Sequence, residues 1–200
     1  MSIPKSLPFQ TPQDEPYFHS LNEDWYGRPL ASTPSFRIIV GPDFLELAFS
    51  AKREPFSAPA SNQGDFHEGL WEYDCAELFL TNPDNGHYLE LHLAPNGAWW
   101  SCYFEEERVQ HDIENRPLPG VLTESLEGIA QWETRLRVPL ASLPPELAFD
   151  LAKTRGNVSF CLGSEPRQTY ASWARLPGDQ PDYHQPSSFL PLERCQAKQG

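Results

Sequence analysis

An all-β, jelly-roll-like antiparallel β-sandwich, folded as a single domain, is the architecture that this sequence predicts. Several segments alternate apolar and polar residues with a period of two, which is typical of half-buried strands. These segments are short and are separated by turn-forming Gly, Pro, Asn and Asp residues. Proline is abundant, with 21 residues in a chain of 200, and proline breaks helices and central strands. No segment sustains the 3.6-residue period of a helix.

The first two strand candidates form a hairpin. Ser35–Val40 is largely apolar, and the turn Gly41-Pro42-Asp43 separates it from Phe44–Ser50. In the second segment three large apolar residues alternate with small or acidic ones, which indicates a strand with one buried face.

A three-strand meander is expected next, after a long connection over residues 51–70. Its strands are Tyr73–Leu80, His87–Leu93 and Ala98–Phe104. An Asn-Gly step and a Pro-Asn-Gly step lie in the two connections, and both favour tight turns.

Three further strand candidates follow residues 105–128, an acidic segment with no regular pattern. They are Ile129–Val138, Val158–Leu162 and Thr169–Trp173. A short helical turn is expected within Pro139–Leu147, and a proline-rich loop over residues 174–190.

Length and charge set the domain organisation and the partners. Residues 1–30 are polar and proline-rich and predict an irregular N-terminal arm, while residues 31–200 predict the sandwich.

The net charge is −13, and a field of that sign repels phosphate backbones and anionic lipid, so no nucleic-acid or membrane partner is expected. Without a signal-peptide pattern or a long apolar run, we expect a cytoplasmic protein. The oligomeric state is left open.

The four cysteines are widely spaced, without a CxxC pair. Three of them, Cys75, Cys102 and Cys161, lie in apolar runs, where a free cysteine behaves as a small buried hydrophobe. We therefore expect reduced thiols, no transition-metal site and no cofactor.

Structural calcium is the one metal that the sequence leaves open. Acidic residues and one histidine cluster around the long connection: Asp65, His67, Glu68, Glu72 and Asp74. Oxygen-rich loops can hold calcium, although this loop lacks the regular spacing of a calcium-binding motif.

Three segments carry a resemblance to a known family. They are Leu70–Leu80 (LWEYDCAELFL), Tyr88–Trp100 (YLELHLAPNGAWW), and Ser172-Trp173 followed by Tyr183–Phe189 (YHQPSSF). In their order and spacing they resemble the family 9 carbohydrate-binding modules and the related DOMON-like domains, and the resemblance extends over residues 35–192.

The resemblance implies a jelly-roll sandwich that holds a small polar ligand, such as a sugar, in a slot between two tryptophans. Those tryptophans fall on Trp71 and Trp173, and the carboxylate of the first segment falls on Glu77. The polar partners are less fixed by the pattern, and the candidates for them are His92, Arg135, Gln168 and Arg175.

Elementary chemistry suits this arrangement, because a sugar presents apolar C–H faces to aromatic rings and hydroxyl groups to carboxylates, amides and guanidinium groups. Two alternatives stay open. Trp71 and Trp173 can be core residues, as we expect Trp99, Trp100 and Trp132 to be. Glu77 can form a structural ion pair with Arg135 or Arg137.

A separate expectation concerns the polar residues of His87–Leu93 and of Ile129–Val138, which can form one surface.

Four functions are compatible with these patterns. The first is non-catalytic carbohydrate binding, and the second is a structural or partner-binding domain that has lost the sugar site. A haem or redox module is the third, restricted to histidine-based ligation because Met1 is the only methionine. The fourth is a hydrolase, for which no GxSxG, HExxH or phosphate-loop motif is present. We expect binding without catalysis.

Overall fold

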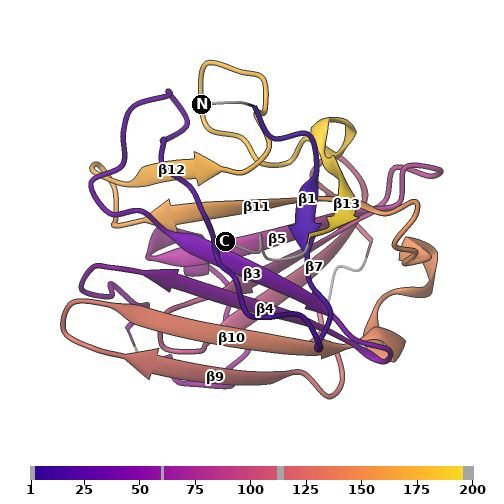
Figure 1. Ribbon diagram of the computed structural model, residues 1–200, viewed down its shortest axis with the longest axis horizontal. Helices are drawn as coiled ribbons and strands as arrows, with labels where there is room; N and C mark the ends of the chain where they lie inside the picture. The colour runs from indigo at the N-terminus through magenta and orange to yellow at the C-terminus, as the bar shows by residue number, and fades with distance from the viewer. Residues whose placement is uncertain (1–2, 60, 112–114, 196–200) are drawn as a thin grey trace.

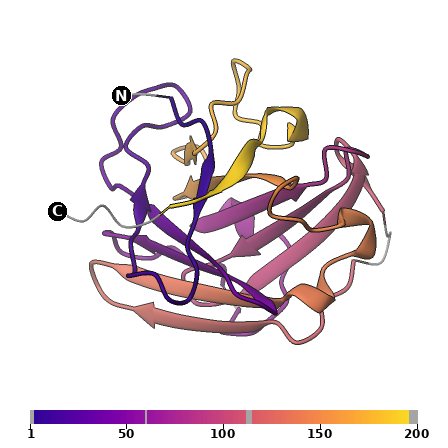
Figure 2. The ribbon, with the colours of Figure 1, turned by 45° about the vertical axis from the view of Figure 1, so that its right-hand side comes forward.

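Two β-sheets packed face to face form the computed structural model, which describes residues 3–59, 61–111 and 115–195 (Figures 1 and 2). In order across the larger sheet, the strands are β1 (Leu7–Phe9), β13 (Leu190–Arg194), β11 (Arg155–Leu162), β5 (Cys75–Thr81), β6 (Tyr88–Leu93), β7 (Trp99–Glu106) and β8 (Val109–Gln110), and β12 (Thr169–Ser172) pairs with β11. Neighbouring strands run antiparallel except β1 and β13, which are parallel. The predicted β-sandwich is confirmed.

The smaller sheet has five strands. In order they are β2 (His19–Ser20), β3 (Ser35–Val40), β4 (Phe44–Ala51), β10 (Trp132–Pro139) and β9 (Leu122–Glu127). Helical structure is limited to single 3₁₀ turns: η1 (Leu70–Glu72), η2 (Leu140–Ser142), η3 (Pro145–Leu147) and η4 (Pro186–Ser188). In the part of the chain that the structure describes, none of these turns has the length and hydropathy of a membrane-crossing helix.

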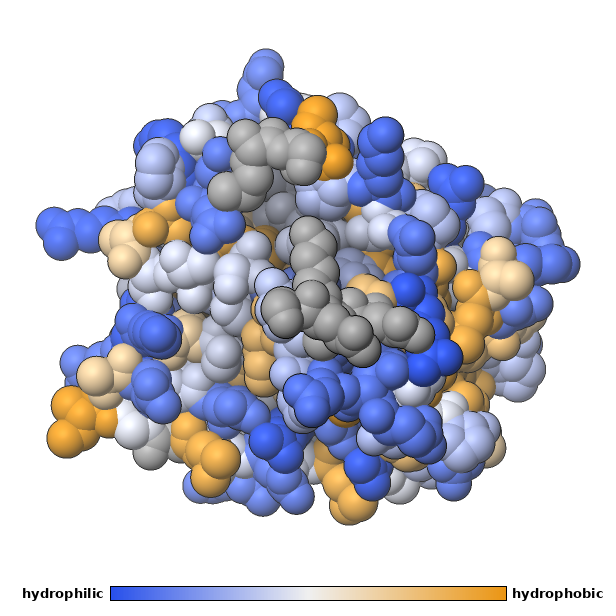
Figure 3. All heavy atoms as spheres, viewed as in Figure 1, coloured by the Kyte–Doolittle hydropathy of each residue, from blue (hydrophilic) through white to orange (hydrophobic). Residues whose placement is uncertain are grey.

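Strand β9 lies inside the segment 105–128 that was expected to be irregular, so that expectation was wrong there. Its inward residue Thr123 is buried, whereas Leu122 and Leu126 are exposed at 66% and 67%. In β9 the polar residue Thr123 therefore faces the core, and the apolar residues Leu122 and Leu126 face the solvent, which is the reverse of the usual pattern. Figure 3 shows such hydrophobic residues scattered among hydrophilic ones on this side of the molecule.

The N-terminal segment, expected to be an irregular arm, contributes a strand to each sheet. β1 pairs with β13 at the edge of the larger sheet, and β2 pairs with β3 at the edge of the smaller one. Both strands are very short, and Pro8 lies in β1, which is consistent with an edge position.

The space between the sheets holds the main hydrophobic core. Ile38, Leu47 and Leu136 lie side by side in the smaller sheet, and Leu78 and Leu91 oppose each other in the larger one. All five are at most 2% exposed. Alternation along each strand places these residues on one face, as the period of two predicts.

The larger sheet is buried on its other face as well. Phe79, Tyr88 and Trp100 point away from the main core, yet all are at most 4% exposed. They belong to a second hydrophobic cluster with Tyr183 and Phe189. This face therefore lies beneath the segment after β12, and every residue of β5 and β6 is buried.

The strand neighbours correct one expectation about the polar faces. β6 lies between β5 and β7, while β10 lies between β4 and β9 in the other sheet. The polar residues of these two strands therefore do not form one surface.

Core packing between the sheets gives a first prediction. Leu47→Ala removes a side chain that is 0% exposed, so we expect the free energy of unfolding in urea to fall by about 2–5 kcal/mol. The matched variant Leu126→Ala, at a position 67% exposed, should cost less than about 1 kcal/mol. Equal losses in the two variants would contradict the outward orientation of Leu126.

Candidate functional site

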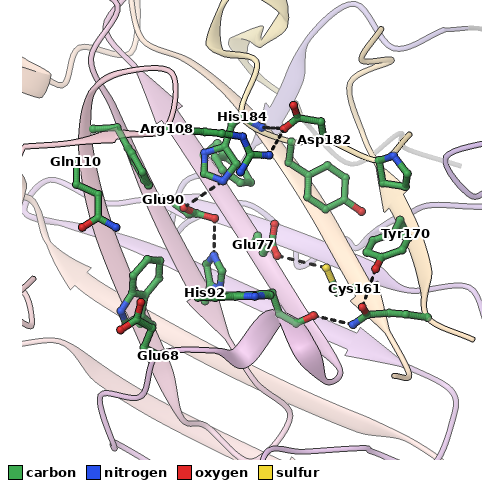
Figure 4. Close-up of a pocket in the computed structure, with 17 residues that line it drawn as sticks. Glu68, Glu77, Glu90, His92, Arg108, Gln110, Cys161, Tyr170, Asp182 and His184 are labelled. Carbon is green, nitrogen blue, oxygen red and sulfur yellow. Dashed lines mark hydrogen bonds and ion pairs between the residues drawn. The ribbon is translucent and has the colours of Figure 1, made fainter. Parts of the chain in front are cut away.

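A cavity of about 450 Å³ opens on the outer face of the larger sheet (Figure 4). Strands β5, β6, β7 and β11 form its floor, and η1 and the segments 108–110 and 168–184 form its walls. The residues that line it, hereafter the sheet cavity, are Glu68, Trp71, Glu77, Phe79, Glu90, His92, Trp100, Phe104, Arg108, Gln110, Cys161, Gln168, Tyr170, Pro181, Asp182, Tyr183 and His184.

Strand register brings the polar floor residues together. Glu77 of β5 lies opposite His92 of β6 on one side and Ser159 of β11 on the other. Glu90 lies two residues before His92 and so points to the same face of the sheet. The cluster thus results from alternation on three neighbouring strands.

Glu77 is a buried carboxylate at the centre of the floor, and only 2% of the residue is exposed. Its Oε2 accepts a hydrogen bond from Ser159 Oγ at 3.0 Å, and Cys161 Sγ lies 3.4 Å from its Oε1. Burial raises the pKa of Glu77, and nearby His92 opposes this rise. The alternative ion pair of Glu77 with Arg135 or Arg137 is absent among the described residues, because these arginines pair with Glu133 and Glu46 in the smaller sheet.

His92 and Glu90 form a buried pair beside Glu77. Nε2 of His92 lies 2.6 Å from Oε1 of Glu90. Burial alone would lower the pKa of His92, but the surrounding acidic groups, Glu90 foremost, raise the pKa well above its ordinary value. The imidazolium form is therefore stabilised by the carboxylate.

A second histidine, His184, also lies close to Glu90. His184 Nε2 lies 3.9 Å from Glu90 Oε2, and its Nδ1 lies 2.8 Å from the hydroxyl of Tyr88. Burial lowers the pKa of His184, so its neutral ring can accept a hydrogen bond from the Tyr88 hydroxyl. The backbone N–H of Arg108 donates to the same hydroxyl oxygen at 3.0 Å.

The aromatic wall of the cavity is formed by Trp71 on η1. This side chain belongs to a residue that is 38% exposed, and its ring makes edge contacts with His92 and Trp100, both at 5.6 Å between centroids. Trp100, on β7, is 4% exposed. An indole with one packed edge and free surface toward a cavity is suited to stacking.

Gln168 holds this wall in place. Its Nε2 donates to the carbonyl oxygen of Trp71 at 2.6 Å, and its Oε1 lies 2.8 Å from the Tyr170 hydroxyl. Figure 4 shows Tyr170 on the side of the cavity next to Cys161. Gln168 thus lines the cavity mainly as a support for the η1 backbone.

The rim carries an ion pair that sequence patterns did not single out. Arg108 Nη2 lies 2.7 Å from Asp182 Oδ1, and both side chains are partly exposed. Asp182 precedes His184 in the segment after β12. Arg108 lies in the acidic stretch that appeared irregular, so only the fold brings these residues together.

Trp173 does not share a slot with Trp71, which corrects the expected two-tryptophan arrangement. Its ring packs edge-on against Phe36, with 5.1 Å between centroids, and its Nε1 donates to the carbonyl of Ser6 at 2.8 Å. The residue packs against the main core. The second tryptophan of the sheet cavity is instead Trp100.

Trp173 and Arg175 border a different cavity of about 660 Å³, hereafter the second cavity, which Trp25 also lines. It is larger than the sheet cavity. Of its charged residues, Glu23, Arg175 and Asp179 are exposed, and Asp24 is paired with Arg28 at 2.7 Å. Volume alone is therefore a poor guide here, because directional recognition needs positioned polar groups.

Two other predicted features lie elsewhere. Arg135 is on the smaller sheet, 2.8 Å from Glu133, and does not line the sheet cavity. Among the acidic residues of the long connection, buried Asp74 accepts hydrogen bonds from the backbone N–H groups of Phe56 and Gly163, and calcium binding by this connection stays a prediction. Burial raises the pKa of Asp74, while the Gly163 N–H lowers it. This carboxylate therefore joins two loops.

Four of the seven predicted site residues thus line the sheet cavity: Trp71, Glu77, His92 and Gln168. Sequence patterns missed Glu90, Arg108, Asp182 and His184 as site residues. His184 lies in the third segment of the resemblance, and Glu90 shares the face of His92, so a signal existed for these two only.

No family model matches the chain. The human UPF0462 protein C4orf33 is 27% identical over 173 residues, which are 82% of this chain and 81% of that protein. Its homologue from Danio rerio is 25% identical over 180 residues, 84% of this chain and 85% of that protein.

Solved structures similar to this one include carbohydrate-binding proteins. A putative carbohydrate-binding protein from Bacteroides uniformis has a TM-score of 0.69 and 20% identity, covering 95% of this chain and 99% of that chain. A family 9 carbohydrate-binding module from Caldicellulosiruptor kristjanssonii, in complex with glucose, has a TM-score of 0.61 and 10% identity, covering 97% of each chain. A complex of such a module with cellotriose also has a TM-score of 0.61 and 10% identity, covering 96% of this chain and 94% of that chain. At these identities the likeness establishes the fold.

The different surroundings of the two tryptophans give a second prediction. Trp173→Ala should lower the free energy of unfolding by about 2 kcal/mol or more, because it removes an aromatic side chain packed on the core. Trp71→Ala should cost about 1 kcal/mol or less, because the wall residue has a large exposed surface. Chemical denaturation of both variants measures this difference. A larger loss for Trp71→Ala would contradict these assignments.

Proposed function

We propose that the sheet cavity binds a small carbohydrate and that the protein does not transform it chemically. The observation that carries this proposal is the combination of an accessible indole, Trp71, with buried polar groups converging on one cavity of about 450 Å³. Ligand sites of this kind have mostly apolar walls, a few positioned polar groups and volumes of about 300–1,000 Å³.

The chemistry of the lining matches the two kinds of surface that a sugar presents. The indole of Trp71 offers a face for the apolar C–H side of a pyranose ring. Carboxylates such as Glu68 and Asp182 accept hydrogen bonds from hydroxyl groups, while Arg108 donates to hydroxyl oxygens. All four residues line the cavity, so both modes of contact are available at once.

The structural neighbours support the same class of ligand. One is a putative carbohydrate-binding protein, and two are family 9 modules in complex with glucose or cellotriose. The neighbours share the fold, and the proposal of a sugar ligand for this chain also draws on its own cavity.

Binding without catalysis is favoured by the state of the two floor carboxylates. Glu77 is engaged by Ser159 and Cys161, and Glu90 is paired with His92. Glycoside cleavage needs an acid and a base that reach the two sides of the scissile bond. Carboxylates this buried and engaged are better suited to holding the floor in shape.

The test is a titration of the protein with glucose and with cellotriose, followed by tryptophan fluorescence and calorimetry. We expect a saturable response for at least one sugar. Trp71→Ala should weaken its binding at least about tenfold, or about 1.4 kcal/mol, because the stacking face is lost.

The matched control is Trp25→Ala, which removes a half-buried tryptophan from the second cavity. This variant should bind the sugar with unchanged affinity. The proposal fails if neither sugar gives a response at concentrations about ten times a millimolar Kd. It also fails if Trp25→Ala abolishes the response while Trp71→Ala preserves it, because the ligand would then occupy the second cavity.

A further inference from the structure

Three side chains with metal-binding atoms meet at the floor of the sheet cavity. One ligand atom from each of Cys75, Glu77 and His92 lies within 4.8 Å of the other two. In the described part of the chain, no other set of three or more His, Cys, Asp or Glu residues comes together in this way. All three residues are at most 2% exposed.

Strand geometry fixes this grouping. Cys75 and Glu77 are two residues apart on β5 and therefore point to the same face of the sheet. His92 lies directly opposite Glu77 on β6. The ligand atoms are thus held by two adjacent central strands, which position side chains more rigidly than loops do.

The imidazole of His92 has one nitrogen that makes no geometrically well-formed hydrogen bond. Its Nε2 is 2.6 Å from Glu90, whereas Nδ1 is buried without such a partner, and the thiol of Cys75 interacts with this imidazole. Metal-ligating histidines characteristically bind a carboxylate through the other ring nitrogen, and the Glu90–His92 pair has this arrangement.

The charge of the floor also favours a cation. Glu77 and Glu90 are buried carboxylates, at 2% and 4% exposure. Among the residues that the structure describes, the lysines and arginines form no ion pair with either one. A buried carboxylate is paired, coordinated to a cation or neutralised by a proton. Because burial raises the pKa of Glu77, a bound cation competes with a proton for the oxygen atoms of Glu77.

We propose that Cys75, Glu77 and His92 form a binding site for a single Zn²⁺ ion. A thiolate, an imidazole and a carboxylate are all zinc ligands in proteins. With metal–ligand bonds of about 2.0–2.3 Å in a tetrahedron, the ligand atoms must approach to about 3.5 Å from one another. From their present separation of up to 4.8 Å, the three side chains have to move toward one another to reach this distance.

Three protein ligands leave a fourth coordination position on a tetrahedral ion. Glu77 and His92 line the sheet cavity, and an open coordination position on zinc accepts water or an oxygen atom of a bound molecule. Loss of the Cys75 and His92 protons accompanies coordination.

Metal binding can be measured on the full chain after removal of bound metal by a chelator, with thiols kept reduced by a phosphine. Titration with Co²⁺ should show one equivalent bound, with the visible bands of tetrahedral cobalt and a thiolate-to-cobalt charge-transfer band. Added Zn²⁺ should displace the cobalt and remove these bands. Zn²⁺ should also raise the melting temperature of the metal-free protein.

Variants identify the ligands. Cys75→Ser should abolish the charge-transfer band. Glu90→Gln should weaken Zn²⁺ binding by about 10–100-fold, because the Glu90 carboxylate orients the His92 ring through its Nε2 atom. The matched control is Cys102→Ser, which alters a thiol that is also buried on this face but outside the cluster; it should retain the band and the stoichiometry. Thermal melting without metal shows whether each variant folds.

The inference is overturned if the folded wild-type protein binds no stoichiometric Co²⁺ or Zn²⁺. It is equally overturned if Cys75→Ser keeps the charge-transfer band or if Cys102→Ser loses it. Should Cys75→Ser fail to fold, His92→Gln takes its place, and wild-type affinity in that variant rejects the site. These measurements use no sugar, so they stand independently of the proposed carbohydrate binding.

Discussion

Burial of both faces of the larger sheet is the constraint on which the rest of the structure depends. Alternation along β5 and β6 sends one set of side chains into the space between the sheets and the other set outward. The outward set is also buried, because the segment after β12 packs over it. A polar residue placed on this outward face therefore cannot be solvated freely and has to find partners within the protein.

The floor of the sheet cavity is a direct result of this constraint. Glu77, Glu90 and His92 occupy outward positions on two adjacent strands. The Glu77–Ser159 hydrogen bond links β5 to β11, and the Glu90–His92 pair lies within β6. The same burial that makes these groups costly also strengthens the electrostatic interactions among them. A polar centre beneath a partly exposed indole is thus a natural place for recognition on an otherwise apolar sheet.

The sequence predicted the sandwich well because long strands such as β4 and β6 show a clear period of two. It did not predict β9, where Thr123 faces inward and two leucines face solvent. Of the site, Trp71, Glu77, His92 and Gln168 were predicted, although no pattern could indicate which tryptophan accompanies Trp71. Trp100 occupies that place because β7 pairs with β6, a relation between strands that period alone does not specify.

The parallel pairing of β1 with β13 affects how the chain folds while it is being synthesised. Leu7 pairs with Leu192, so the edge of the larger sheet joins segments that lie far apart in sequence. During synthesis the ribosome exposes β1 long before its partner strand exists. Contacts of such large sequence separation slow folding, and an unpaired edge is open to association with other chains. This edge of the larger sheet is therefore completed only after residues 190–194 have been synthesised.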